Sequence, residues 1–382
     1  MKILFLTNPA FSLAPSKRGG ARFLVDICKE ISLRGNQVDV LSIVNRGGKS
    51  MEAETSFRII NCEESKVLSS LRPILMGLKL AKNKYDLIFM GILITTGALG
   101  TYLISRLFRI PFIMLLHGID MDYIRSKFFF DRFLTRLYFK GSRLILVNSS
   151  ATGQKAVLNG ADPSKIKVLN PGVDTDVFYR RNNLKKYLDK YGLNGKRVIL
   201  TVARLVKRKG HRSVIEAVAR LAGEMANIHY LIVGEGPECQ GLMELARSLG
   251  ITDKVSFVGP VNEDELPDYY SLSDIFVMPT LAEGNNYEGF GMVYLEANAC
   301  GVPVIGSKSG GVLDAIVDGE TGILVEENNV DELFKAIKRL LCDDSLRARM
   351  GKAGRARAET FFSWKMVGDK LEGYLRECLG KN

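Results

Sequence analysis

The chain has 382 residues, of which 46% are hydrophobic and 25% are charged, the composition of a globular protein long enough for two domains. No apolar run approaches the roughly 20 residues that span a membrane, and the first residues predict a β-strand rather than a signal peptide. The cysteines include no C-x-x-C pair and the histidines lie far apart, so we expect no disulfide framework, no metal site and a reducing cytoplasm.

The net charge of +11 is unevenly distributed along the chain. Residues 1–170 carry 25 Lys and Arg against 12 Asp and Glu, a net charge of +13, whereas residues 171–382 carry −2. We therefore expect an anionic partner for the first half of the chain only.

Short apolar runs alternate with segments of helical length and spacing in residues 1–170. This alternation predicts a parallel, doubly wound α/β sheet, in which ligands bind outside the carboxyl ends of the strands. Strands are expected at 3–7, 38–44, 87–90, 112–116, 144–148 and 166–169, and helices at 20–34, 65–83, 97–109, 129–141 and 151–160.

Polar or flexible residues follow two of these strands. Gly19 and Gly20 open the helix after the first strand, where a glycine pair lets the backbone approach a phosphate, although a flexible turn is an equal alternative. His117 comes directly after the strand 112–116, at the edge of the sheet where ligands bind. Asp120 and Asp122 follow it; they could chelate a divalent cation, but we favour an acceptor-binding role.

Residues 123–140 interleave five basic side chains with seven aromatic ones. Such a segment is typical of a helix at a membrane interface, which predicts an anionic membrane surface as a partner and a peripheral location on its cytoplasmic face. An alternative fits almost as well, in which Phe129, Phe133 and Leu137 are the core stripe of a helix packed on the sheet.

Chain-breaking residues at 170–178 predict a domain junction, and a strand at 198–203 begins the second half. Four cations lie within the six residues after that strand, which favours an anion site over a solvated turn. Further strands are expected at 228–233, 255–259 and 322–325, and helices at 211–221, 330–342, 345–360 and 363–379.

The stretch 285–306 predicts a loop, a helix and a strand. We expect the helix to begin at about Phe290, with its free amide N–H groups directed at a phosphate. Glu288 and Glu296 flank this start, and eight helical residues rise roughly 12 Å, too far for the carboxyl pair of a glycoside hydrolase. We therefore expect one glutamate at each end of an elongated ligand, the alternative being two unrelated surface residues.

The motif Glu288-x7-Glu296, with Gly-Phe-Gly inside it and Ala-Cys-Gly-Val-Pro-Val after it, resembles the signature of retaining family 4 glycosyltransferases (glycosyl transferases group 1). The resemblance implies the GT-B fold, an α/β architecture of two doubly wound Rossmann-like domains facing across a cleft. Residues 1–170 would bind the acceptor and residues 171–362 the nucleotide sugar. The C-terminal helix, within residues 363–382, would return to the N-terminal domain.

The resemblance also implies roles for individual residues. Glu288 would contact the donor sugar and Glu296 the ribose hydroxyls. Arg204 and Lys209 match an R-x4-K-G pair that neutralises the leaving diphosphate, and His117 would lie beside the transferred sugar. Further donor contacts are expected from Gly19, Gly20, Val258, Gly289, Phe290, Gly291 and Met292, and sugar or acceptor contacts from Asp120, Asn285 and Asn286.

The resemblance therefore implies a retaining hexosyltransferase (EC 2.4) that moves a sugar from a nucleoside diphosphate sugar to a glycan or lipid-linked acceptor, in cell-surface glycan or glycolipid synthesis. Cations and amides would stabilise the leaving group, so we expect neither a cofactor nor a metal. A nucleotide-sugar epimerase or hydrolase on the same fold remains an alternative. Nucleic-acid binding is disfavoured because the basic excess lacks an RNP-like, zinc-module or helix-turn-helix pattern. The sequence does not identify the donor base, the sugar, the acceptor or the oligomeric state.

Overall fold

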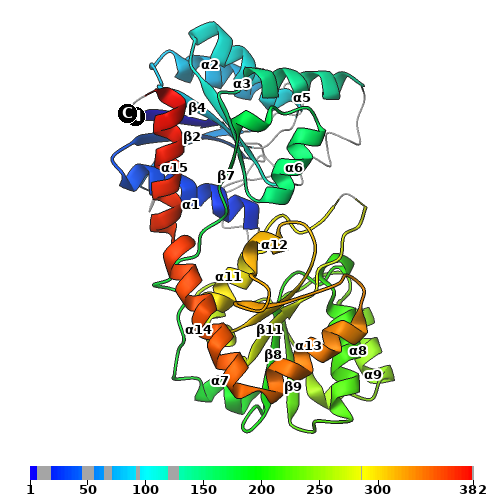
Figure 1. The fold of residues 1–382 in the computed structure, drawn as a ribbon. Helices are drawn as coiled ribbons and strands as arrows, with labels where there is room; N and C mark the ends of the chain where they lie inside the picture. Colours follow the sequence, from blue (N-terminus) through cyan, green and yellow to red (C-terminus); the bar gives the residue numbers. More distant parts are fainter. Residues whose placement is uncertain are drawn as a thin grey trace. The chain divides into compact units, whose positions relative to one another are not determined.

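The computed structural model describes residues 1–6, 19–44, 56–63, 71–91, 95–118, 129–284 and 286–380. The chain divides into two compact units (Figure 1). The first consists of Met1–Pro171 together with Trp364–Asn382, and the second of Gly172–Ser363. No helix in the described part of the chain is long and apolar enough to cross a membrane.

The first unit is built on a parallel sheet with the strand order β3-β2-β1-β4-β5-β6-β7. Strands β4, β5 and β6 are buried and apolar along their whole length, because helices cover both faces of the sheet. Its strands are β1 (Lys2–Leu6), β2 (Gln37–Val44), β3 (Arg58–Glu63), β4 (Leu87–Gly91), β5 (Phe112–Leu116), β6 (Leu144–Val147) and β7 (Ile166–Val168). Its helices are α1 (Gly19–Leu33), α2 (Leu71–Ala81), α3 (Thr95–Phe108), α5 (Phe129–Gly141), α6 (Ser150–Leu158) and α15 (Trp364–Leu379), with a 3₁₀ turn η2 (Pro163–Lys165).

The helices of the first unit are divided between the two faces of its sheet. On one face, residues of α1 and α15 pack with Ile113 and Leu115 of β5. On the other face, residues of α2, α3, α5 and α6 pack with Phe112, Met114 and Leu116 of the same strand. This alternation follows from the two-residue period of a strand.

Strand β3 is not expected from the sequence, because polar residues interrupt its apolar pattern. It lies at the edge of the sheet and pairs in parallel with β2. Arg58 of β3 donates two hydrogen bonds, of 2.8 and 2.7 Å, to the fully buried Asp39 of β2. Tyr85 donates a third of 2.5 Å. The ion pair between neighbouring strands compensates for the missing apolar residues.

The second unit has a parallel sheet with the order β10-β9-β8-β11-β12-β13. Its strands are β8 (Arg197–Val202), β9 (Ile228–Val233), β10 (Val255–Gly259), β11 (Ile275–Met278), β12 (Val304–Ser307) and β13 (Gly322–Val325). Its helices are α7 (Lys185–Lys190), α8 (His211–Ala222), α9 (Cys239–Ser248), α10 (Leu266–Leu272), α11 (Met292–Ala299), α12 (Val312–Ala315), α13 (Val330–Cys342) and α14 (Asp344–Phe361), with 3₁₀ turns η3 (Lys207–Lys209) and η4 (Thr252–Lys254).

The strand order of the second unit reverses direction at β8. Its neighbours β9 and β11 continue the chain on opposite sides, so the loops after β8 and β11 leave the sheet next to each other. Such a switch point is where open α/β sheets bind their ligands. Helices α7, α9 and α10 are not expected from the sequence, because they are short and two of them follow loops rich in turn-forming residues.

Candidate functional site

Two loops meet at the switch point of the second unit, one after β8 and one after β11. The Leu281 N–H of the second loop donates a 2.8 Å hydrogen bond to the Arg208 carbonyl oxygen of the first. Gly210 has a φ of 72°, and a Cβ at this position would lie 2.0 Å from the Pro279 carbonyl oxygen. Only glycine permits this approach, so Gly210 allows the basic turn η3 to pack closely against the loop after β11.

Three charged side chains converge where these loops meet. The Glu288 carboxylate accepts a 2.8 Å hydrogen bond from Arg208 Nη1 and a 2.5 Å hydrogen bond from Lys209 Nζ. The three side chains are between 14% and 19% exposed, so the pairing lies largely out of water. Two cations share one carboxylate, which leaves a net positive charge in a partly desolvated place.

The charge state of Glu288 depends on its two neighbours. Burial alone would raise the pKa of this carboxyl, but the charges and hydrogen bonds of Lys209 and Arg208 outweigh burial and lower the pKa to about 2. Glu288 is therefore ionised at neutral pH. It cannot act as a general acid there, and its role is to accept hydrogen bonds and hold positive charge in place.

Glycines hold the loop that carries Glu288 against the start of α12. The Gly311 N–H donates a 2.9 Å hydrogen bond to the Glu288 carbonyl oxygen. A Cβ at Gly311 would lie 2.0 Å from the Gly289 carbonyl oxygen, and one at Gly310 would lie 2.4 Å from the ring of Tyr287. Larger residues at either position would displace the loop and with it the carboxylate.

Helix α11 begins at Met292, two residues later than expected from the sequence. Gly291 is left-handed, with a φ of 88°, and such a residue ends the helical hydrogen-bonding pattern at the N-terminal side. The Phe290 side chain is buried, and the hydroxyl of Tyr294 donates a 2.5 Å hydrogen bond to the Met278 carbonyl oxygen. These contacts anchor the helix N-terminus at the end of β11.

The two glutamates of the motif have different surroundings. Glu296 lies in the middle of α11, is 6% exposed and accepts a 2.7 Å hydrogen bond from the Tyr270 hydroxyl. Glu288 lies in the loop before the helix and pairs with Arg208 and Lys209. The two carboxylates therefore have separate partners, which agrees with separate roles rather than one acid/base pair.

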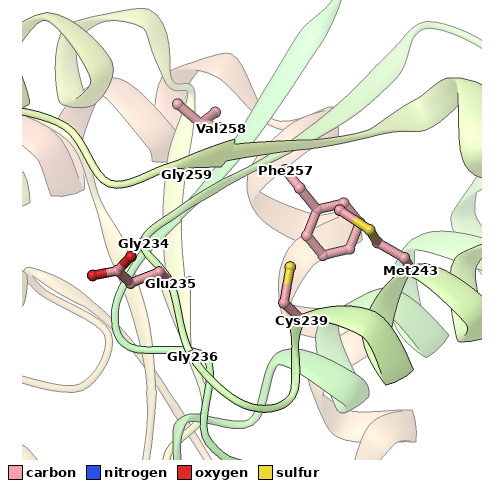
Figure 2. Close-up of a pocket in the computed structure, with 8 residues that line it drawn as sticks. All are labelled: Gly234, Glu235, Gly236, Cys239, Met243, Phe257, Val258 and Gly259. Atoms are coloured by element: carbon pink, nitrogen blue, oxygen red, sulfur yellow. The ribbon is translucent and has the colours of Figure 1, made fainter.

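A hollow of about 510 Å³ opens at the carboxyl ends of β9 and β10 (Figure 2). The side chains of Cys239, Met243 and Phe257 gather on one side of it, and Glu235 stands on the glycine-rich turn. Val258 also lines the hollow, although its side chain points away from Phe257. The turn is tied to the loop after β8, because the Leu205 N–H donates a 2.9 Å hydrogen bond to the Glu235 carbonyl oxygen.

Family models match the chain in two parts. The model described as Glycosyl transferases group 1 matches residues 185–357, and the model described as Glycosyltransferase Family 4 matches residues 17–177. The chain belongs to the family 4 glycosyltransferases.

Curated relatives carry mannosyltransferase and glycosyltransferase names. The chain is 38% identical over 206 residues to the GDP-mannose-dependent α-(1-6)-phosphatidylinositol monomannoside mannosyltransferase of Mycolicibacterium smegmatis, covering 53% of this chain and 54% of the relative. A protein of the same name from Mycobacterium tuberculosis is 35% identical over 242 residues, 62% of either chain. D-inositol 3-phosphate glycosyltransferase of Mycobacterium bovis is 34% identical over 251 residues, covering 63% of this chain and 50% of the relative. The match therefore spans between half and two thirds of each relative.

Solved structures share the fold over almost the whole chain. HepE of Anabaena, in complex with UDP, superposes with a TM-score of 0.82 at 22% identity and covers 99% of this chain and 100% of that chain. Sucrose-phosphate synthase of Thermosynechococcus elongatus has a TM-score of 0.83 at 20% identity, with 100% of both chains covered. The predicted α/β class with two Rossmann-like units of the GT-B type is confirmed.

In this family 4 glycosyltransferase, His117 follows β5 of the first unit. Its side chain is 6% exposed, and the ring of Phe23 from α1 meets it edge-on at 5.5 Å. Burial lowers the pKa of His117 to about 4. The imidazole is therefore neutral at pH 7, where it can exchange hydrogen bonds but carries no charge.

The remaining predicted residues are spread over the two units. Gly19 and Gly20 are the first residues of α1. The side chain of Arg204 is exposed, and it is the carbonyl oxygen of this residue that contacts the buried His211 ring, at 3.1 Å. Asn286 is exposed in a turn that pairs with Glu283. Asp120 and Asn285 lie outside the described residues, as do residues 123–128 of the basic and aromatic segment.

The structure adds one residue to the charged cluster that the sequence motif does not single out. Arg208 lies between Lys207, which is exposed, and Lys209. It shares the Glu288 carboxylate with Lys209. Arg208 belongs to the run of four cations that is visible in the sequence. The sequence does not show which side chains of this run contact Glu288. Among the described residues no group of three His, Cys, Asp or Glu is arranged to hold a metal ion, and independence from a metal stays a prediction.

Proposed function

We propose that this protein is a retaining glycosyltransferase that moves a hexosyl group from a nucleoside diphosphate sugar to an acceptor hydroxyl. The observation that carries the proposal is the cluster of Arg208, Lys209 and Glu288 at the switch point of the second unit. Such a cluster suits a diphosphate, because its cations are already in place and only partly neutralised. Membership of the family supports the same assignment.

The leaving diphosphate needs stabilisation as the glycosidic bond breaks. The bond from the anomeric carbon to the diphosphate oxygen breaks while a bond to the acceptor oxygen forms on the same face of the sugar. Arg208, Lys209 and the amide N–H groups at the start of α11 hold the departing negative charge, and Arg204 lies on the same loop. The acceptor proton passes to an oxygen of the leaving diphosphate, so no protein carboxylate is needed as base.

Glu288 has a positioning role in this mechanism. Its ionised carboxylate orients Lys209 and Arg208 before the donor binds and can accept a hydrogen bond from a sugar hydroxyl. Glu296, held by Tyr270, would accept hydrogen bonds from the ribose. The hollow at the ends of β9 and β10 is the candidate place for the base.

The relatives suggest which substrates to try first. GDP-mannose is the donor and a phosphatidylinositol mannoside the acceptor in the names of the mycobacterial relatives. HepE was solved with UDP, so uridine donors belong in the same panel. We propose a lipid-linked or membrane-proximal acceptor, because the first half of the chain carries a net charge of +13.

A transfer assay with a panel of GDP-, UDP- and ADP-sugars tests the proposal. Lys209→Ala and Arg208→Ala should each lower kcat/KM by roughly 10² to 10³-fold, the loss expected for one oxyanion-hole donor. Lys207→Ala is the matched control, because Lys207 is exposed in the same turn and should remain near the wild-type value. Equal activity of all three variants, or fast consumption of the donor without any acceptor, would contradict the mechanism.

A further inference from the structure

Among the helices of the first unit, the cationic excess lies on one face of the sheet. The helices on one side, α1 and α15, carry five Lys and Arg against five Asp and Glu. The helices on the other side, α2, α3, α5 and α6, carry seven Lys and Arg against one Asp, Asp131. On a surface that contacts only solvent, positive and negative side chains are usually interspersed.

Exposed apolar side chains lie among these cations. Leu103 and Leu107 of α3 are 49% and 68% exposed, and Phe133 of α5 is 59% exposed. On the same helices Arg106, Arg132 and Arg136 are also exposed. These six residues form what we call the basic apolar face.

The six residues lie on two helices that pack against each other. Helix α3 packs against both α2 and α5, and the three lie side by side in Figure 1. Tyr102 of α3 contacts Tyr138 of α5 with ring centroids 5.9 Å apart, which holds the two helices together beneath the exposed residues. The inward residues Ile104 and Leu134 belong to the core, so Leu107 and Phe133 are not needed for packing.

We propose that the basic apolar face docks on an anionic lipid surface. Exposed leucine and phenylalanine side chains enter the boundary between headgroups and acyl chains, and the arginines beside them pair with lipid phosphates. A nucleic acid would use the arginines but offers no apolar layer for Leu107 and Phe133. The proposal deepens the proposed function, since it names the surface by which the enzyme would reach a lipid-linked acceptor, but vesicle binding requires no transfer reaction.

Flotation with vesicles tests the face directly. Wild-type protein should float with vesicles that contain phosphatidylglycerol, much less with pure phosphatidylcholine, and high salt should weaken the binding. The variant Arg106→Ala/Arg132→Ala/Arg136→Ala should bind roughly a hundred-fold more weakly, about five-fold for each cation lost. The variant Leu107→Ser/Phe133→Ser should lose the portion of the binding that survives high salt.

A matched control removes the same charge from the other unit. Lys335, Arg349 and Lys352 are exposed on α13 and α14, and their triple alanine variant should float like the wild type. Equal losses in the two triple variants, no flotation of the wild type at low salt, or preferential binding of RNA or DNA over vesicles would overturn the proposal. Transfer to a water-soluble acceptor, measured without vesicles, should be equal in all variants. A loss of vesicle binding is therefore distinguishable from a failure of the proposed reaction.

Discussion

At the scale of single residues, a local excess of positive charge lies next to Glu288 in the second unit. The carboxylate is held by two cations, and each of the three side chains is less than one fifth exposed. Removing one partner from such a cluster leaves the other charges buried without a counter-charge. The resulting loss of stability is larger than the net stabilisation that the ion pairs provide. Stability and activity should therefore both depend on Glu288.

The variant Glu288→Gln should destabilise the second unit at neutral pH by about 1–3 kcal/mol, because two largely buried cations lose their counter-charge. The difference from the wild type should depend on pH. The folded-state pKa of about 2 is below the ordinary value of 4.5, so the stabilisation by Glu288 is complete above pH 4.5 and is lost as the pH falls towards 2.

Thermal unfolding of the two proteins at several pH values measures this difference. We expect the gap in Tm of the second unit to close as the pH falls below 4.5. A difference in Tm between the two proteins that stays constant down to a pH of about 2 would show that Glu288 contributes through packing rather than through charge.

At the scale of elements, the site depends on how closely two loops approach. The turn η3 and the loop after β11 are joined at Gly210, where the backbone of one faces the carbonyl oxygen of Pro279 in the other. A turn carrying three cations would otherwise extend into solvent, where its charges repel one another least. The close approach is what brings Arg208 and Lys209 to Glu288.

Gly210→Ala should therefore lower the free energy of unfolding by more than the strain of its left-handed backbone alone explains. Gly250 is a matched control, because its φ of 69° is close to the 72° of Gly210 but nothing lies within 4 Å of the added Cβ. Gly250→Ala should lose about 1 kcal/mol from left-handed strain. Gly210→Ala should lose several kcal/mol, or displace η3 and reduce transfer activity.

Urea unfolding and the transfer assay on both variants separate the two effects. A similar cost for the two substitutions would mean that the loops can move apart freely and that the close approach at Pro279 does not position the cations.

At the scale of the whole molecule, the chain forms two units, each with a sheet and core of its own. The last helix, α15, belongs to the first unit although it follows the second along the chain. Val367, Leu371 and Leu375 of α15 are buried in the core beneath α1. Arg34 of that unit donates a 2.9 Å hydrogen bond to Asp369, which fixes the helix at its surface.

Deletion of residues 364–382 should unfold the first unit and leave the second intact. Burial of three large apolar side chains contributes about 5 kcal/mol or more, which is comparable with the whole stability of a domain. Differential scanning calorimetry should show the loss of one of two transitions, and a nucleoside diphosphate should still raise the Tm of the other. Deletion of residues 380–382 alone is the control and should change neither, because α15 ends at Leu379. Loss of both transitions in the longer deletion would show that the two units fold as one.

The sequence by itself determined the architecture and the general place of the candidate site. Apolar strands alternating with helices predict two doubly wound sheets, because only parallel strands covered on both faces bury such runs completely. The glycines around Glu288 and the cations after β8 are likewise visible in the sequence, and the structure joins Lys209 to Glu288. These features are local, and local patterns of burial and turn formation are what a sequence records.

The tertiary structure decided which side chains meet. The sequence pairs Arg204 with Lys209 as partners of a diphosphate, which stays a prediction. The structure adds that Arg208 contacts Glu288, because the 3₁₀ turn sets the direction of its side chain. Helix α11 begins late because Gly291 is left-handed. The grouping of exposed arginines with Leu107 and Phe133 on one face depends on the packing of separate helices, and no segment of the chain contains that information by itself.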